Sequence, residues 1–441
     1  MSTPFDELLI LSSDPDSETK LAALRSDMLE AARSSGPDSA QNRTVIEVLG
    51  EIRQRGDAAV AAYTEKFDKV ALKPEEFRIT VGALAAAHAS MDATLMASLR
   101  QAIENVRSYQ SKIFLGHHFA FSEGTGMRFT PVRRVGVCVP GASAPLPSTV
   151  IMTVVPALVA GVQEIALVSP PRHEGGVHPV ILAVCHELGV TEVYRIGGVQ
   201  AVGALAYGTQ TIGKVDMIVG PGNSWVQAAK KNVAGDYVGI DSIAGPSEVF
   251  IIANDEANPA WVAADMLSQA EHADDSSAVV ATDSESLARA ILEHLAQQLE
   301  VLPRAADARQ SLERFSRVIV LNDLDAVVAL ADEFATEHLE IQCGTRSREI
   351  ADRIHNAGAI FIGPHTPVAV GDYWAGPSHT LPTGTRAKFS SALTSNDFVK
   401  SISLIEYSAA QLAASADDII RLAQVEGLDA HARSVQIRQP D

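Results

Sequence analysis

Two short stretches of the chain bring together side chains of complementary chemistry. In LSQAEH, Gln269 and His272 are three residues apart, so on a helix they would share a face and could touch one ion. In ATEHLEI, Glu337 and His338 are adjacent, and a carboxylate beside an imidazole can divide general-base and general-acid work. Both patterns also fit a purely structural interpretation: a capping histidine with a surface glutamine, and an exposed pair at a helix end.

A third group of candidates lies toward the C-terminus. The stretch GDYWAGPSHTLPTGTRAKFSS contains Asp372 and His379, and an irregular segment of this length in a compact protein tends to be functional. Glu426 and His431 are five residues apart in a helical pattern, so they would share a face poorly unless the helix breaks at Gly427. Because glutamine is an uncommon ligand, the spacing alone does not select a metal site.

The order of the apolar segments predicts the scaffold that positions these residues. From Arg134 onward, apolar runs of strand length alternate with longer helical patterns, and a second series of the same kind runs from Val249 to near Ile362. Such alternation is typical of mainly parallel sheets covered by helices. We expect two Rossmann-like α/β domains with a cleft between them, and ligands at the strand ends that face the cleft.

The expected division of the chain has four parts. They are a helical N-terminal segment (1–28), a first α/β domain (29–122 with 247–390), a second α/β domain (123–246) and a helical C-terminal tail (391–441). Three Gly-rich turns follow predicted strands, in VPGASAPLPS, IGGVQAVGAL and VGPGNSW, and each could present backbone N–H groups to an anion. None matches the GxGxxG dinucleotide fingerprint, and tight turns need glycine whatever they bind.

Composition limits the partners and the compartment. The 54 acidic residues exceed the 35 basic ones, a formal net charge of -19 that disfavours nucleic acid and anionic membrane surfaces. Three scattered cysteines, Cys138, Cys185 and Cys343, fit a reducing compartment rather than a disulfide scaffold. We find neither a signal-peptide pattern at the N-terminus nor an apolar run of membrane-spanning length. We therefore expect a soluble cytoplasmic protein that binds neither nucleic acid nor membrane.

Several longer segments resemble one enzyme family. The segments GPGNSWVQAAKK, IDSIAGPSEV, AADMLSQAEH, TEHLEI, GDYWAGPSHTLPTG, KFSSALTSNDFVK and EGLDAHARSV resemble those of the histidinol dehydrogenase family, in the family's order and approximate spacing. The resemblance extends from about residue 40 to 438. It implies oxidation of L-histidinol through L-histidinal to L-histidine, the last steps of histidine biosynthesis, with NAD as the acceptor and one zinc ion per subunit.

The resemblance also implies roles for individual residues. The zinc ligands would be Gln269, His272, Asp372 and His431, an N/O set that suits zinc. His338 would take the hydroxyl proton and Glu337 would activate water for the second oxidation. The substrate contacts would be Ser247, Gln269, His272, His338, Asp372, Glu426 and His431. Gln200 and Asn223 would contact NAD.

Two further implications concern assembly and a departure from the family's pattern. The family forms homodimers in which the C-terminal segment completes the partner's site, so Glu426 and His431 would serve the other subunit. The family often has an aromatic residue, usually tyrosine, where this chain has Cys138 in VGVCVPG, so Cys138 is not among the expected contacts with NAD. Ala273 replaces a common glycine after His272, which is a milder change.

Three other functions compete with this interpretation. A related dehydrogenase could act on another small alcohol, such as a sulfonated propanediol, although Glu426 would repel a sulfonate. A zinc hydrolase could use Glu337 as its base, but the chain lacks HExxH or a comparable His-rich motif. A non-catalytic NAD-binding protein would require a broken acid/base pair or ligand set, and all six positions are intact.

Overall fold

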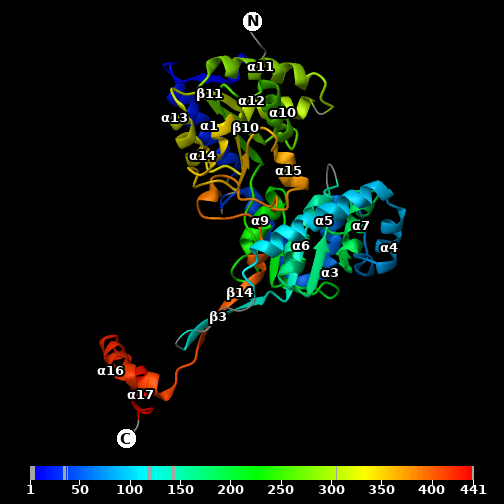
Figure 1. Cartoon of the computed structure of the whole chain (residues 1–441). Coiled ribbons are helices and arrows are strands. Elements are labelled where there is room, and N and C mark those ends of the chain that lie inside the picture. Colours follow the sequence, from blue (N-terminus) through cyan, green and yellow to red (C-terminus); the bar gives the residue numbers. More distant parts are fainter. Residues whose placement is uncertain are drawn as a thin grey trace. The chain divides into compact units, whose positions relative to one another are not determined.

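The computed structural model describes residues 5–32, 36, 38–116, 122, 124–141, 145–303 and 305–439. The chain divides into two compact units, which we describe separately. The first combines Met1–Phe114 with Arg133–Asp397, and the second combines Leu115–Val132 with Phe398–Asp441 (Figure 1). Two six-stranded sheets form the framework of the first unit. This confirms the expected α/β class with parallel sheets.

The first sheet is parallel throughout. Its strands, in spatial order, are β1 (Leu9–Leu11), β11 (Arg317–Val320), β10 (Ser277–Thr282), β9 (Glu248–Ala253), β12 (His338–Gln342) and β13 (Ala359–Ile362). The strands are mostly buried on both faces, as their continuous apolar runs predict. Chain order reverses between β9 and β12, and such a switch point is where open α/β sheets commonly bind ligands.

Helices cover both faces of this sheet. One face packs against α1 (Ser17–Ala32), α13 (Leu324–Phe334) and α14 (Ser347–Ala351). The other packs against α10 (Pro259–Ala270), α11 (Glu285–Leu299) and α12 (Ala305–Phe315), with α15 (Val368–Tyr373) against α10. Short 3-10 helices occur at Asp6–Leu8, Pro74–Glu76, Gly344–Arg346, Arg386–Lys388 and Ser395–Phe398.

The second sheet has one antiparallel edge strand. Its spatial order is β2 (Arg78–Ile79), β6 (Glu192–Tyr194), β5 (Glu164–Val168), β4 (Arg134–Cys138), β7 (Met217–Val219) and β8 (Gly239–Ile240), with β2 antiparallel to β6. One face shares a core with α2 (Ala40–Arg55), α3 (Asp57–Asp68), α8 (Gly198–Tyr207) and α9 (Ser224–Val233). The chain segments that contribute to this sheet also contain the helices α4 (Val81–Ser90), α5 (Ala93–Ile113), α6 (Pro147–Val159) and α7 (Pro179–Glu187).

The packing of the N-terminal quarter corrects the expected division of the chain. Residues 29–122 were grouped with 247–390, but β2 pairs with β6, and α2 packs on α8 and α9 of the second sheet. The segment 1–28, which was expected to be helical, contains most of α1 and also supplies an edge strand, β1, to the first sheet. Helical periodicity identifies the apolar face of a helix but not the sheet that this face will cover, which explains the error.

The second unit is small and comes from two distant parts of the chain. Strand β3 (Thr125–Pro131) pairs antiparallel with β14 (Val399–Ile405) over seven residue pairs. Beyond β14 lie α16 (Ala409–Val425) and α17 (Asp429–Gln436), separated at Gly427, whose φ is 71°. The helix therefore breaks at Gly427, which is the condition under which Glu426 and His431 could face the same site. Within the expected helical tail of 391–441, α-helices occur only beyond β14, and Ser395–Phe398 before it forms a 3-10 helix.

No helix in the described part of the chain is both long enough and apolar enough to span a bilayer.

Candidate active site and cofactor pocket

The adjacent Glu337 and His338 lie at the switch point of the first sheet, at the amino ends of its strands. His338 begins β12, and its Cα is paired with that of Val249, the second residue of β9. Leu339 points into the core on the α13 face, so His338 lies on the α10 face by the alternation of a strand. Both residues are buried, with 6% and 4% exposure, which excludes the interpretation of an exposed pair at a helix end.

The protonation of His338 follows from one hydrogen bond. Its Nδ1 lies 2.9 Å from the backbone oxygen of Glu248. Because a carbonyl can only accept, Nδ1 carries the proton, and Nε2 keeps its lone pair in the neutral ring. That Nε2 is buried without a hydrogen-bond partner and lies 4.0 Å from Oδ1 of Asp372. Burial lowers the pKa of His338, which favours this neutral form and therefore a general base.

Glu337 is held in a setting that favours its neutral form at moderate pH. Burial raises the pKa of its carboxyl group to about 8, and the negative charge of Asp372 adds to the rise. Hydrogen bonds from the backbone N–H of Glu248, at 2.9 Å, and from the Ser247 hydroxyl act in the opposite direction. Its Oε2 lies 3.5 Å from Nδ1 of His338. The predicted substrate residue Ser247 therefore touches the candidate base directly.

Three of the predicted metal ligands are in this unit, two near the end of α10 and one on α15. Gln269 is fully buried, and neither its amide oxygen nor its amide nitrogen has a hydrogen-bond partner. His272 directs Nδ1 to the backbone oxygen of Ser268 at 2.9 Å, which leaves Nε2 free to bind a metal. Asp372 lies near enough to His272 and His338 for both to lower its pKa, although burial raises it more.

These residues fit a zinc ion. A buried amide with no partner is costly, and a metal bound to its oxygen would remove that cost. An imidazole nitrogen and a carboxylate complete a donor set that zinc accepts. Within the described ranges, no three His, Cys, Asp or Glu side chains form a metal-binding cluster by themselves.

His379 joins the same group of side chains. Its Nδ1 lies 3.9 Å from Oδ1 of Asp372, and burial lowers its pKa to about 4. The hydroxyl of Thr149 on α6 is 3.5 Å from its Nε2, and Ser378 donates to the backbone oxygen of Met152 on the same helix. Helix α6 packs against β4 of the second sheet, so these bonds connect the segment that follows α15 with that sheet.

A separate pocket of about 470 Å³ lies at the carboxyl ends of the second sheet. Its walls come from the residues that follow β4, β5, β6 and β7, and from α2 and α3. The order of strands reverses between β4 and β7, so this is the position at which open α/β sheets bind nucleotides. The three Gly-rich turns of the sequence all contribute to this pocket, through Gly141, Gly197 and Gly222.

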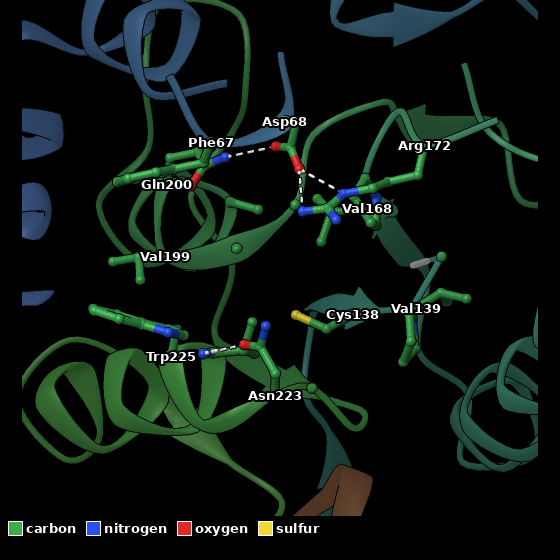
Figure 2. A pocket seen from close by; sticks show the side chains of 18 of the residues that line it. Phe67, Asp68, Cys138, Val139, Val168, Arg172, Val199, Gln200, Asn223 and Trp225 are labelled. Atoms are coloured by element: carbon green, nitrogen blue, oxygen red, sulfur yellow. Dashed lines mark hydrogen bonds and ion pairs between the residues drawn. The ribbon is translucent and has the colours of Figure 1, made fainter. Parts of the chain in front are cut away.

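Both predicted NAD contacts line this pocket (Figure 2). Gln200 is fully buried; its Nε2 donates to Asp68 at 3.1 Å, and its Oε1 has no partner. Asn223 caps α9 by accepting from the N–H of Val226. A pocket with an unsatisfied buried acceptor fits a ligand that carries hydroxyl or amino donors, such as a dinucleotide. Cys138 lines the same wall, and burial raises the pKa of its thiol to about 12.

A buried ion pair shapes the turn that presents Asn223. Lys230 on α9 pairs with Asp241 and also donates to the backbone oxygen of Gly220, while Asp241 accepts from the N–H of Gly220. Gly220 has φ of 104°, and a Cβ there would lie 2.3 Å from the backbone oxygen of Cys138. Only glycine fits this position, so the packing of β4 against β7 requires the first glycine of the GPG sequence.

Residues 31–439 match the family model described as histidinol dehydrogenase. The chain belongs to the histidinol dehydrogenase family. A histidinol dehydrogenase from Geobacillus kaustophilus is 44% identical over 401 residues, covering 90% of this chain and 94% of the relative. One from Moorella thermoacetica is 45% identical over 398 residues, covering 90% and 93%. The crystal structure of histidinol dehydrogenase from Elizabethkingia anophelis has a TM-score of 0.89 at 33% identity, covering 98% and 97%.

In this family member, two of the predicted site residues belong to the second unit. Glu426 is the residue that ends α16, and His431 lies on α17; both are exposed within the chain. Large apolar side chains nearby are exposed as well, among them Leu422 at 66%, Val425 at 81% and Ile437 at 72%. A contiguous surface of exposed apolar side chains would be typical of a region that a partner covers.

The sequence patterns gave no role to three residues that lie beside Asp372 or in the pocket with Gln200. His379 was noted in its loop, but only folding brings it beside Asp372. Asp68 and Arg172 line the pocket with Gln200, and neither stands out in a motif. A usable signal existed for Arg172, because it closely follows the strand β5 in SPPRH and so lies at the ligand-binding edge of a parallel sheet.

Proposed function

We propose that this protein oxidises L-histidinol through L-histidinal to L-histidine, using two NAD molecules and one zinc ion per subunit, as the last steps of histidine biosynthesis in the cytoplasm. The observation that carries the proposal is the buried pair of Glu337 and His338, which lies beside His272 and Asp372. The Nε2 atom of His338 has no hydrogen-bond partner and faces Asp372. Such a group can bind a polar substrate and remove a proton from it.

His338 serves the first oxidation. Its Nε2 accepts the proton of the substrate hydroxyl while a hydride leaves the carbinol carbon, which yields the aldehyde. The bond from Nδ1 to the Glu248 oxygen holds the ring in the productive tautomer and helps to carry the positive charge that the ring acquires. Bound NAD supplies the hydride acceptor, a role for which Gln200 and Asn223 would hold it.

Glu337 serves the second oxidation. An aldehyde has no hydroxyl group from which hydride loss can give an acid, so water must first add to it. The Glu337 carboxylate takes a proton from this water, and the hydrate then loses a second hydride and a proton to give the carboxylate product. Ser247 and the N–H of Glu248 hold the carboxylate in place by donating to it.

The residues that would hold zinc are Gln269, His272 and Asp372 of one subunit, together with the partner subunit's His431. When bound, zinc would fix the imidazole and amine of histidinol and thereby orient its carbinol carbon. We assign Glu426 of the partner subunit to the substrate amine. The exposed apolar side chains of the second unit support a homodimer in which each C-terminal segment completes the other subunit's site.

One assay tests the proposed function. Purified protein reconstituted with zinc should form two NADH and one histidine for each histidinol consumed. A sulfonated propanediol should give no NADH, because Glu426 would repel its charge. NADH formation from the diol but not from histidinol would show that the substrate is the diol. Ester or amide cleavage without NAD reduction would instead indicate a hydrolase.

Chelation should abolish activity without unfolding the protein. The cores of the two sheets are large and independent of the proposed ligands, so the metal contributes little to folding. A strong chelator should remove NADH formation while the far-ultraviolet circular dichroism stays unchanged. Added zinc should restore the rate, less effectively at acidic pH because protonated imidazoles cannot bind metal. Loss of the dichroism on chelation would contradict this expectation.

The second oxidation should depend on pH through Glu337. A general base must be ionised, and burial raises the pKa of this carboxyl group to about 8, so the rate should rise with pH toward that value. Oxidation of supplied histidinal at saturating NAD, followed from about pH 6 to pH 10, measures this. A rate that is constant across this range would show that ionisation of Glu337 does not control the step.

A further inference from the structure

The cofactor pocket contains an isolated pair of opposite charges. Among the described residues that line the pocket, Asp68 and Arg172 are the only charged side chains. The Asp68 side chain is 4% exposed, whereas 45% of the Arg172 side chain is open to solvent. The carboxylate is therefore enclosed, and the guanidinium remains accessible to a ligand in the pocket.

Hydrogen bonds fix the position of this pair. Oδ1 of Asp68 accepts from Nε and Nη2 of Arg172, at 3.1 and 3.0 Å, and Oδ2 accepts from Nε2 of Gln200 at 3.1 Å. Figure 2 shows Asp68 between the other two side chains. Both carboxylate oxygens thus have internal donors. The bonds to Asp68 use two of the five N–H groups of Arg172, and the others are left for a ligand.

The same wall of the pocket contains a helix start that favours an anion. Helix α8 begins at Gly198, and its N-cap, Gly197, provides no side-chain hydrogen bond to the first turn. Both glycines line the pocket. The first backbone N–H groups of a helix carry partial positive charge and attract phosphate groups. The buried Oε1 of Gln200, on the first turn of α8, is without a partner and would accept a hydrogen bond from the same ligand.

We propose that Arg172 binds a phosphate group of the nicotinamide dinucleotide, and that Asp68 positions its guanidinium for this contact. The inference rests on the proposed function, because it takes the pocket to be the dinucleotide site. The phosphate could be one of the pyrophosphate or, in NADP, the 2′-phosphate of the ribose. Arginine suits either, since its planar fork donates two parallel hydrogen bonds to phosphate oxygens.

The pair also bears on the choice between NAD and NADP. Enzymes that select NAD commonly use a free carboxylate to accept from the ribose hydroxyls, and that carboxylate repels a 2′-phosphate. Asp68 is less suited to this role, because Arg172 donates twice to its Oδ1 and balances its charge, and Gln200 already donates to its Oδ2. Arg172 is therefore the residue in this pocket that a phosphate would meet.

Binding measurements on Arg172→Gln test the proposal independently of catalysis. Isothermal titration calorimetry with NAD, NADP and adenosine separates the possible phosphates, because adenosine has none. Loss of a charge-assisted bond should weaken dinucleotide binding by about 10- to 100-fold and leave adenosine binding unchanged. Equal weakening for NAD and NADP would identify the pyrophosphate, and weakening for NADP alone would identify the 2′-phosphate. Arg172→Lys should weaken binding less, since it keeps the charge.

Arg133→Gln provides a matched control. Arg133 is also ion-paired, with Glu164 at 2.9 Å, and does not line the pocket, so its removal changes the net charge equally without touching the ligand. Unchanged dinucleotide affinity in Arg172→Gln, or equal weakening for adenosine and the dinucleotides, would overturn the role of Arg172. A wild-type protein that binds adenosine but neither dinucleotide would overturn the proposed function as well, so the two failures can be told apart.

Discussion

Replacement of Glu337 by glutamine is expected to stop the second oxidation and to spare the first. Only the aldehyde needs an activated water, and glutamine keeps the shape of the side chain and one accepting oxygen while removing its basicity. Histidinal oxidation should fall by roughly 10²- to 10⁴-fold, the usual effect of losing a general base. Starting from histidinol, the variant should release about one NADH per substrate while the aldehyde accumulates, measured by trapping it with a hydrazine.

The neighbouring His338 provides the comparison for this experiment. His338→Asn should slow the first oxidation, because the free Nε2 that receives the hydroxyl proton is lost. Zinc content and histidinol binding should stay near the wild-type values in the Glu337 variant, since Glu337 is not among the proposed ligands. Unimpaired oxidation of histidinal by Glu337→Gln would show that another group activates the water.

Mixed dimers should recover activity that neither parent variant has. His272→Ala and His431→Ala each remove one proposed zinc ligand, so each homodimer should be inactive. If His431 serves the partner subunit, a heterodimer of the two variants has one site without both ligands and one complete site. Co-expression with two different tags and sequential purification should then yield about half of the wild-type activity per dimer.

The same experiment has a simple negative outcome. If His431 served its own chain, every site in the mixture would lack one ligand, and a verified heterodimer would be inactive. A heterodimer of two differently tagged His272→Ala chains controls for effects of the tags and of purification. An inactive mixed dimer would exclude the shared site and leave the role of the Glu337–His338 pair unaffected.

Most of the fold could be predicted from the sequence because its strands and helices carry strong local patterns. The observed alternation of strands and helices from β4 to α9 and from β9 to β13 agrees with the alternation of apolar runs and helical patterns in the sequence. The assignment of helices to sheets was not, because an amphipathic face such as that of α2 is compatible with either sheet. Strand β1 was missed for a related reason, since three residues carry too little periodicity.

The candidate site was predictable only in part. The family resemblance selected Glu337, His338 and the proposed ligands, but spacing could not give the distances among segments far apart in the chain. The pocket of the second sheet lies at the carboxyl ends of its strands, where ligands were expected to bind. In the first sheet, Glu337 and His338 lie at the opposite edge, where β9 and β12 begin. The end of α10 carries Gln269 back to this edge, a result of topology rather than of sequence pattern.

The ribbon of β3 and β14 has a consequence for synthesis on the ribosome. A nascent chain exposes β3 long before its partner β14, which begins at Val399, so the ribbon can close only after the whole segment between the two strands has been synthesised. Until then, β3 presents an unpaired edge, which favours association with other extended chains. Truncated products would retain that edge permanently. A chain that stops before Val399 therefore cannot form the second unit that the structure describes.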